Sequence, residues 1–261
     1  MSNTQLTSKD ILMIYAYRVM FVFIIALLIA LSSCFEAHAE HGKPAVTLGQ
    51  ISSIQSTVLS KNIPLSIHLP PNYDSTKHNY PVLYMLGSDY RARFAMLASA
   101  LDYMGGSQIP AMLLVGIDLP EGNRVLLPSR ANGDTKSPDS YLAFIEKELI
   151  PYVDNKYRTA PFRALFGASN SGFFSVYTLL NKPSLFNAYL ASSPSLNHIP
   201  VKLQQKIKTG PLKTLSENKS LHIIYSDDDF DEITESIPEF SRMLTDHKPT
   251  NLTYKSQQVI N

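Results

Sequence analysis

The sequence lacks several features that would place it in a specialised class of protein. It has one cysteine, Cys34, among 261 residues, which excludes an internal disulfide bond, and no Cys/His spacing resembles a zinc site. Basic and acidic residues nearly balance, 23 against 22, and the chain has no basic run or stripe. Nucleic acid is therefore not expected as a partner, because its phosphates need clustered cations. Internal repeats and low-complexity tracts are absent as well.

What the chain does have is enough apolar material for one large core. Hydrophobic residues make up 44% of its 261 residues, and α/β folds of more than about 200 residues commonly form a single domain. We expect a short linker at residues 40–50 and one catalytic domain at residues 51–261.

Residues 1–39 are predicted to be an export signal. Lys9 and Arg18 precede an apolar run from Val19 to Leu31. That run has the length of a signal-peptide core and is short for a membrane span. An uncleaved signal anchor is the alternative, although two small-residue cleavage patterns follow the run.

Two processing routes for this signal stay open. The sequence AHA, ending at Ala39, would leave Glu40 as the first residue after cleavage. The sequence LSSC, ending at Cys34, resembles a bacterial lipobox and would make Cys34 a lipid anchor. The protein is therefore expected outside the cytoplasm, either free in the periplasm or attached to a membrane through lipidated Cys34.

The remaining chain alternates short β-branched stretches with longer segments of helical period, the pattern of a mostly parallel sheet covered by helices on both faces. The first two strands alternate most clearly and are expected to form an antiparallel edge. The predicted strands are Ile51 to Leu59, Ile63 to Leu69, Val82 to Leu86, Met112 to Ile117, Ala164 to Phe166, Ala188 to Ser192, Leu221 to Tyr225 and Leu252 to Val259.

Two further helices are predicted from capping and periodicity. Ser137 followed by Pro138 is typical of an N-cap with proline at the first helical position, and an apolar face then continues to about Asp154. A later helix is expected from Ile233 to about Thr245. Its Pro238 predicts either a kink or a later start for that helix.

Ser169 stands in the strand, turn and helix context of a nucleophile elbow. An apolar strand runs into GASNSG at residues 167–172, and Phe173 to Leu180 then reads as a helix. Small neighbours allow the strained turn that projects the serine Oγ above the sheet. The usual G-x-S-x-G pattern has glycine where this chain has Ser171. We interpret Ser169 as the nucleophile, with an ordinary glycine-flanked turn as the alternative.

Four segments, in order along the chain, resemble the "putative esterase" family of α/β-hydrolases. This family includes siderophore esterases, S-formylglutathione hydrolases, feruloyl esterases and mycolyltransferases. The matching segments are YPVLYMLGSD from Tyr80 to Asp89, VGI from Val115 with Asn123 and Arg124, FIEKELIPY from Phe144 to Tyr152, and FNAY from Phe186 with SPSL from Ser193. The likeness is strongest to the siderophore-esterase branch, although Asn197 and His198 stand where tryptophans often follow SPSL there.

The resemblance implies an α/β-hydrolase fold and an oxyanion hole made of two backbone amides. One amide belongs to Asn170, just after the nucleophile. Aligning the family's LLDG on residues 85–88 gives the second amide to Asp89. Arg124 has two readings, recognition of an anionic substrate group or a structural salt bridge.

The acid of the catalytic triad is expected just after the strand that ends at Tyr225. The five acids there are Asp227, Asp228, Asp229, Asp231 and Glu232. We favour Asp229 by its spacing from the strand, with Asp227 and Asp231 as alternatives, because a carboxylate there would orient the catalytic histidine.

The catalytic histidine is missing at the place where this fold puts it, in the loop after the last strand. Only Ile260 and Asn261 follow Val259. His247 precedes that strand and is expected to end a helix, and His198 follows SPSL but precedes the acid. A sequence truncated after the last strand is the simpler explanation, and a naturally inactive relative is the other.

The sequence therefore predicts a serine esterase that acts on a small-molecule ester through an acyl-enzyme on Ser169, without metal or organic cofactor. The activity of the 261-residue form is expected to be weak or absent. Two alternatives stay open: a non-catalytic exported binding protein on a hydrolase scaffold, and an acyltransferase of the same fold.

Overall fold

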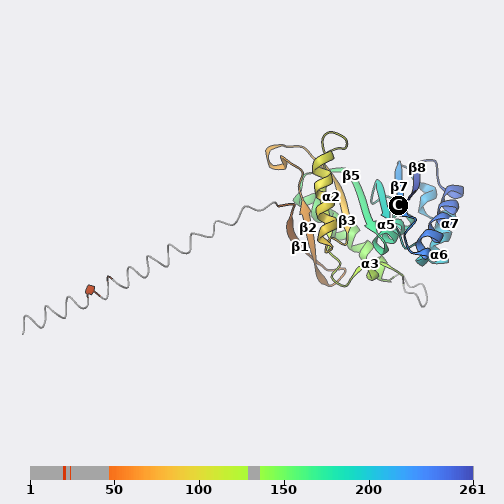
Figure 1. Cartoon of the computed structure of the whole chain (residues 1–261), viewed down its shortest axis with the longest axis horizontal. Helices are drawn as coiled ribbons and strands as arrows, with labels where there is room; N and C mark the ends of the chain where they lie inside the picture. The colour runs from red at the N-terminus through yellow and green to blue at the C-terminus, as the bar shows by residue number, and fades with distance from the viewer. Residues whose placement is uncertain (1–19, 22–23, 25–46, 129–135, 261) are drawn as a thin grey trace, which may run out of the picture. The chain divides into compact units, whose positions relative to one another are not determined.

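The computed structural model describes residues 20–21, 24, 47–128 and 136–260 (Figure 1). The chain divides into two compact units, Met1–Thr47 and Leu48–Asn261. The predicted cleavage patterns and Cys34 lie outside the described residues. Within the described ranges, no helix has both the length and the apolar character needed to cross a membrane.

The second unit is built on one eight-stranded sheet, in the order β1-β2-β4-β3-β5-β6-β7-β8. All eight predicted strands are present. Their bounds are β1 Gln50–Ser56, β2 Lys61–His68, β3 Tyr80–Leu86, β4 Leu113–Ile117, β5 Thr159–Ala168, β6 Ala188–Ser192, β7 Lys219–Ser226 and β8 Leu252–Val259.

The first two strands form the antiparallel edge that their alternation predicted. β1 pairs with β2 and β2 with β4 in antiparallel register, whereas the pairs from β4 through β8 are parallel. The one large difference in length is β5, which begins at Thr159 instead of Ala164. Its first half pairs with β3 but is partly exposed, so it lacks the apolar signal of a buried strand.

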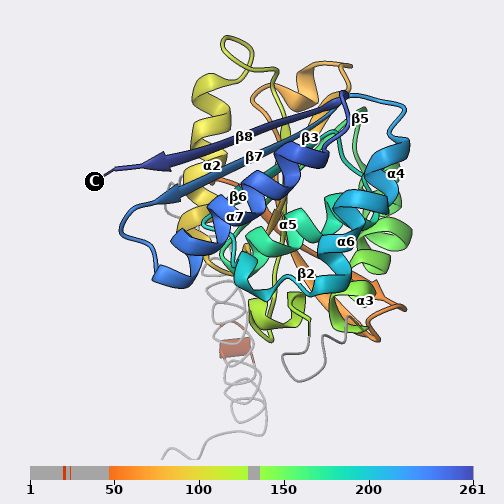
Figure 2. The ribbon, with the colours of Figure 1, turned by 90° about the vertical axis from the view of Figure 1, so that its right-hand side faces the viewer.

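Helices cover both faces of the sheet (Figures 1 and 2). On one face α2 buries Phe94, Ala98 and Leu101 against Leu83 and Met85 of β3. The other face belongs to the larger core, to which the remaining α-helices contribute. The helices are α2 Arg91–Met104, α3 Lys136–Phe144, η3 Ile145–Leu149, α4 Ile150–Lys156, α5 Asn170–Asn181, α6 Val201–Thr209 and α7 Asp231–His247, with short 3-10 helices η1 Tyr73–Ser75, η2 Asn123–Leu126, η4 Leu196–His198 and η5 Pro211–Thr214.

Two predicted helix starts are corrected by the structure. The helix expected to begin after Ser137 begins at Lys136, and the Ser137 hydroxyl donates to the carbonyl of Val125 at 2.6 Å instead of capping the helix. The later helix begins at Asp231, ahead of Pro238, which lies inside it. An exposed proline is accommodated there because the apolar face around it, including Ile237 and Phe240, is buried.

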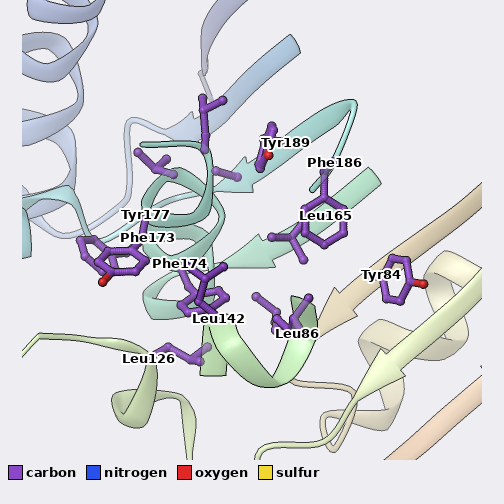
Figure 3. Packing of buried hydrophobic residues seen from close by; sticks show 14 of the residues in the cluster. Tyr84, Leu86, Leu126, Leu142, Leu165, Phe173, Phe174, Tyr177, Phe186 and Tyr189 are labelled. Atoms are coloured by element: carbon purple, nitrogen blue, oxygen red, sulfur yellow. The ribbon is translucent and has the colours of Figure 1, made fainter. Parts of the chain in front are cut away.

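Helix α5 lies at the centre of the larger core (Figure 3). Phe173, Phe174 and Tyr177 are almost completely buried, and the rings of Phe174 and Tyr177 stack at 5.9 Å between centroids. Leu86 and Leu165 of the neighbouring strands belong to the same cluster. This packing fixes the helix, and with it the residue immediately before the helix, Ser169.

Glu148 holds the β1–β2 turn against the π-helical turn η3. Its carboxylate accepts the Ser56 hydroxyl at 2.5 Å and the amides of Thr57 and Val58 at 2.9 and 3.0 Å. Partial burial by itself would raise the pKa of Glu148, but these hydrogen bonds outweigh it and lower the pKa below its ordinary value.

We therefore expect Glu148→Gln to lower the free energy of unfolding by about 1 kcal/mol at neutral pH. A depressed folded-state pKa stabilises the fold above the unfolded-state pKa and is lost as pH falls through the folded-state value. The difference in melting temperature between the two proteins should therefore shrink under acid conditions. Lys147→Gln, at an exposed neighbouring residue, is the matched control. An unchanged difference at low pH would contradict the ionic origin.

Candidate active site

The candidate site lies at the carboxyl edge of the parallel strands. The loops after β3, β5, β6 and β7 all leave the sheet at this edge, because these strands run in the same direction. The turn Gly87–Asp89 follows β3, Ser169 follows β5, and the SPSL segment follows β6. The acidic loop, which contains Asp227, Asp228 and Asp229, follows β7. A parallel sheet thus gathers segments that are far apart in the sequence.

Ser169 occupies a strained turn between β5 and α5. Its φ of 56° and ψ of −121° place a non-glycine residue in a sparsely populated region of backbone conformation. The Ser169 amide donates to the carbonyl of Ser192 at 2.9 Å, and its own carbonyl accepts the amide of Phe173 at 2.9 Å as α5 begins. Within the described residues, the Oγ of Ser169 has one hydrogen-bonding contact, the Oγ of Ser195 at 3.5 Å.

The turn depends on glycine two places before the serine. A Cβ on Gly167 would lie 2.1 Å from the carbonyl oxygen of Ser171, which is well inside van der Waals contact. Ser171, at the place where the usual motif has a second glycine, is buried and tolerated. The backbone of α5 approaches the backbone of Pro194 closely at Gly172 instead, because a Cβ there would lie 3.1 Å from the Cα of Pro194.

The two predicted oxyanion amides lie in turns that approach each other. Asn170 is the first residue of α5, where backbone amides have no intrahelical acceptor. A Cβ on Gly87 would lie 3.9 Å from the Oγ of Ser171, so the Gly87–Asp89 turn lies against the first turn of α5.

The hydrogen bonds of this turn single out the amide of Asp89. The amides of Gly87 and Ser88 both donate to the carbonyl of Ile117, at 2.9 and 3.1 Å. The next two amides are also engaged, that of Tyr90 by the Gly87 carbonyl and that of Arg91 by the Asp89 carbonyl. Among the described residues, no backbone carbonyl accepts the Asp89 amide. Its assignment stays a prediction.

The acidic loop holds Asp229 differently from its neighbours. Asp229 Oδ2 accepts the Ser193 hydroxyl at 2.6 Å and the Ser226 amide at 2.8 Å, and its side chain is half-buried. Asp227, Asp228, Asp231 and Glu232 are exposed. No hydrogen bond within the described part of the chain reaches Asp229 Oδ1, which leaves that oxygen to accept another donor.

No described histidine is hydrogen-bonded to Ser169. His247 ends α7, as expected, and its Nδ1 lies 3.0 Å from the carbonyl of Met243. His68 is buried between the carbonyl of Leu48 and Asp102, at 2.8 Å from each. His222 lies within β7, where burial and the charge of Lys255 lower its pKa.

His198 is three residues after Ser195, whose hydroxyl contacts that of Ser169. It closes η4, and its amide donates to the carbonyl of Ser195 at 3.3 Å. His38 and His41 lie outside the described residues.

Arg124 is exposed on η2 and, in the part of the chain that the structure describes, has no carboxylate within ion-pair distance. The structural salt bridge is therefore not found there. The neighbouring Asn123 accepts the side-chain amide of Asn170 at 3.0 Å, which ties η2 to the elbow.

Sequence reasoning missed two polar residues at this edge. Ser193 follows β6 in a left-handed conformation, with φ 43°, and binds Asp229. Asp118 follows β4 and is nearly inaccessible, at 5% exposure. For Asp118, the available signal was a polar residue directly after the fully apolar strand β4, whereas β6 itself ends in Ser192 and gives Ser193 no such signal.

Comparison with known proteins gives one family over most of the described domain. Residues 56–237 match the family described as "Putative esterase". The ferri-bacillibactin esterase of Bacillus subtilis is 28% identical over an alignment of 142 residues, and the match covers 45% of this chain and 48% of that protein. The chain thus matches about half the length of this relative.

Solved structures agree with the fold. An IroE-like serine hydrolase from Shewanella oneidensis has a TM-score of 0.68 and 26% identity, over 81% of this chain and 73% of that one. The BES protein from Bacillus cereus has a TM-score of 0.72 and 18% identity, over 85% and 92%. The predicted α/β-hydrolase fold is confirmed by these likenesses.

Proposed function

Because the chain belongs to the "putative esterase" family of α/β-hydrolases, we propose that it cleaves small-molecule carboxylic esters through an acyl-enzyme on Ser169. The observation that carries the proposal is the strained Ser169 at the N-terminus of α5. Its hydroxyl attacks the ester carbonyl carbon, and the alcohol leaves. Water then attacks the acyl-enzyme and releases the carboxylic acid.

The oxyanion of each tetrahedral intermediate is bound by the amides of Asn170 and Asp89. Such donors act where negative charge develops, and the N-terminal end of the α5 dipole adds to them. Two observations support this role: Asn170 directly follows Ser169 at the start of α5, and a Cβ on Gly87 would lie 3.9 Å from the Oγ of Ser171 in the first turn of that helix.

Asp229 serves as the acid that orients the catalytic histidine. Its Oδ2 is tied to Ser193 and Ser226, which leaves Oδ1 for an imidazole N–H. The Ser193 link also joins the acid to the nucleophile, because the preceding residue, Ser192, accepts the amide of Ser169.

Arg124 recognises an anionic group on the substrate. Its exposure, and the contact of neighbouring Asn123 with Asn170, support a role at the mouth of the site. Esters of siderophores are the first substrates to test, because relatives of this chain are named siderophore esterases, including one from Emericella nidulans that is 43% identical over 61 residues.

Turnover by the 261-residue chain is weak in this proposal, because without a general base the serine is a poor nucleophile. In the described part of the chain, the hydroxyl of Ser169 is hydrogen-bonded to Ser195 and to no histidine. The same observation favours a second candidate function, a binding protein on the hydrolase scaffold that binds its ligand without turnover. In both proposals, residues 1–39 direct export of the protein.

A fluorophosphonate probe tests the nucleophile directly. We expect a single covalent adduct on Ser169, formed more slowly than in a complete serine hydrolase, because oxyanion stabilisation survives the loss of a triad member. Intact-mass analysis measures the adduct and peptide mapping places it. Ser169→Ala should form none, whereas Ser195→Ala should still react. An adduct that persists in the Ser169→Ala protein would overturn the assignment.

A further inference from the structure

The buried side chains of Ser88 and Asp118 form a polar cluster at the turn that follows β3. Asp118 is 5% exposed and Ser88 is fully buried. The Ser88 hydroxyl donates to Asp118 Oδ1 at 2.5 Å. Arg91 donates to both oxygens of the same carboxylate, with Nη2 2.7 Å from Oδ2 and Nη1 3.0 Å from Oδ1. A buried carboxylate needs such partners, and Arg91 supplies them from a side chain that is 51% exposed.

The cluster is also hydrogen-bonded to the backbone of the turn. Arg91 Nη1 donates to the carbonyl oxygen of Ser88 at 2.9 Å. That carbonyl and the amide of Asp89 belong to one peptide unit, and in a trans peptide they point to opposite sides of the chain axis. Anchoring the carbonyl of Ser88 therefore fixes the direction of the Asp89 amide.

Neighbouring residues are adapted to this arrangement. A Cβ on Gly116 of β4 would lie 2.4 Å from the Cβ of Ser88, so glycine there makes room for the buried serine. The carboxylate of Asp89 accepts the amide of Leu119 at 3.1 Å, which ties the other end of the peptide to the loop that carries Asp118.

We propose that Arg91 and Asp118 are positioning residues for the oxyanion hole: together they hold the Ser88–Asp89 peptide with its amide directed at the carbonyl oxygen of the ester that Ser169 attacks. The inference rests on the proposed function, because it assigns a task to residues that support the Asp89 amide. Neither residue touches the substrate. Their effect is confined to steps in which negative charge develops on a carbonyl oxygen.

A cysteine at the nucleophile position separates this role from a general effect on folding. In Ser169→Cys protein, a p-nitrophenyl ester acylates the thiol through a tetrahedral oxyanion, whereas iodoacetamide alkylates it by direct displacement without one. A thiol is partly ionised near pH 8, so neither reaction waits for a general base. Peptide mass spectrometry follows each adduct on the introduced thiol and distinguishes it from an adduct on Cys34.

In this background, Arg91→Met and Asp118→Asn should each slow acylation about ten- to hundredfold, since loss of an oxyanion donor costs on that scale. Alkylation should change less than about twofold. Arg91→Lys should recover part of the acylation rate, because an ammonium still donates to the Ser88 carbonyl. Arg163→Met is the matched control, because it breaks another arginine–carboxylate pair, with Asp154, and should leave the ratio of the two rates unchanged.

Each other outcome overturns the inference in a recognisable way. Acylation at the parent rate in Arg91→Met and Asp118→Asn shows that the pair does not position the amide, and leaves Ser169 as the nucleophile. A parallel fall of acylation and alkylation shows a structural disturbance instead. A Ser169→Cys parent that alkylates but does not acylate overturns the proposed function, and the inference with it. Melting curves accompany every variant, and Arg91→Lys serves if the methionine variant does not fold.

Discussion

Gly167→Ala should abolish the reaction of Ser169 with a fluorophosphonate and should lower the free energy of unfolding by at least about 3 kcal/mol. The new Cβ would lie 2.1 Å from the carbonyl oxygen of Ser171 and 2.3 Å from its carbonyl carbon. Both are backbone atoms in the first turn of α5, so they cannot rotate away as a side chain would. The turn must open, which removes the strained geometry that presents Ser169.

Gly106→Ala is the matched control for this prediction. Gly106 has a φ of +77°, which an alanine adopts only with strain, but a Cβ there would meet no atom within 4 Å. Its cost should be about 1 kcal/mol, from backbone conformation alone. Thermal unfolding followed by circular dichroism compares the two variants, and intact-mass analysis compares their adducts. A Gly167→Ala protein that melts and reacts like the parent would show that the elbow has another geometry.

The sequence predicted most of the sheet because its strands carry local signals. Short apolar runs became β3, β4 and β6 close to the predicted bounds, and alternation identified the antiparallel edge formed by β1 and β2. The exposed half of β5 has no such signal. Local patterns are informative where burial dictates residue type, and they lose that value where a strand is held mainly by backbone pairing.

The candidate site was predictable where it depends on neighbours in the chain. The elbow needs only Gly167, Ser169 and the residues between and after them, so its motif is visible in sequence. The Arg91–Asp118 pair joins residues 27 positions apart. No periodicity links them, because their contact exists only after β3 and β4 have paired. The same is true of Ser193 and Asp229, which lie 36 positions apart on the loops of two strands.

The helix starts predicted from capping residues and proline were wrong because tertiary contacts determine where these helices begin. Ser137 has the residue type of an N-cap, but the carbonyl of Val125 offers its hydroxyl a partner in η2. Pro238 has the residue type of a helix breaker, yet α7 continues through it because Ile233, Ile237, Phe240 and Leu244 are buried along one face. Packing of a long apolar face outweighs one missing backbone hydrogen bond.

Adding a histidine-bearing segment after Asn261 should raise ester hydrolysis by at least about a thousandfold, because loss of a triad base costs on that scale. β8 runs parallel to β7, and the amide of Asp227 donates to the carbonyl of Val259 at 3.1 Å. A chain leaving Val259 therefore emerges at the carboxyl edge of the sheet, beside the acidic loop. We expect a histidine placed there to hydrogen-bond to both Asp229 Oδ1 and Ser169 Oγ, as a general base requires.

The segment is taken from a related esterase, starting at its histidine loop, and initial rates with p-nitrophenyl acetate are compared with those of the 261-residue chain. Two matched chimeras isolate the cause of any gain. One carries glutamine in place of the added histidine, and the other carries Ser169→Ala, and neither should exceed the parent rate. The melting curve shows whether the chimera folds. A folded chimera that hydrolyses the ester no faster than the parent would contradict the hypothesis that the chain is an esterase lacking only its general base. The binding-protein alternative would then explain Ser169 better, because a nucleophile with an oriented acid and an added base should hydrolyse an ester.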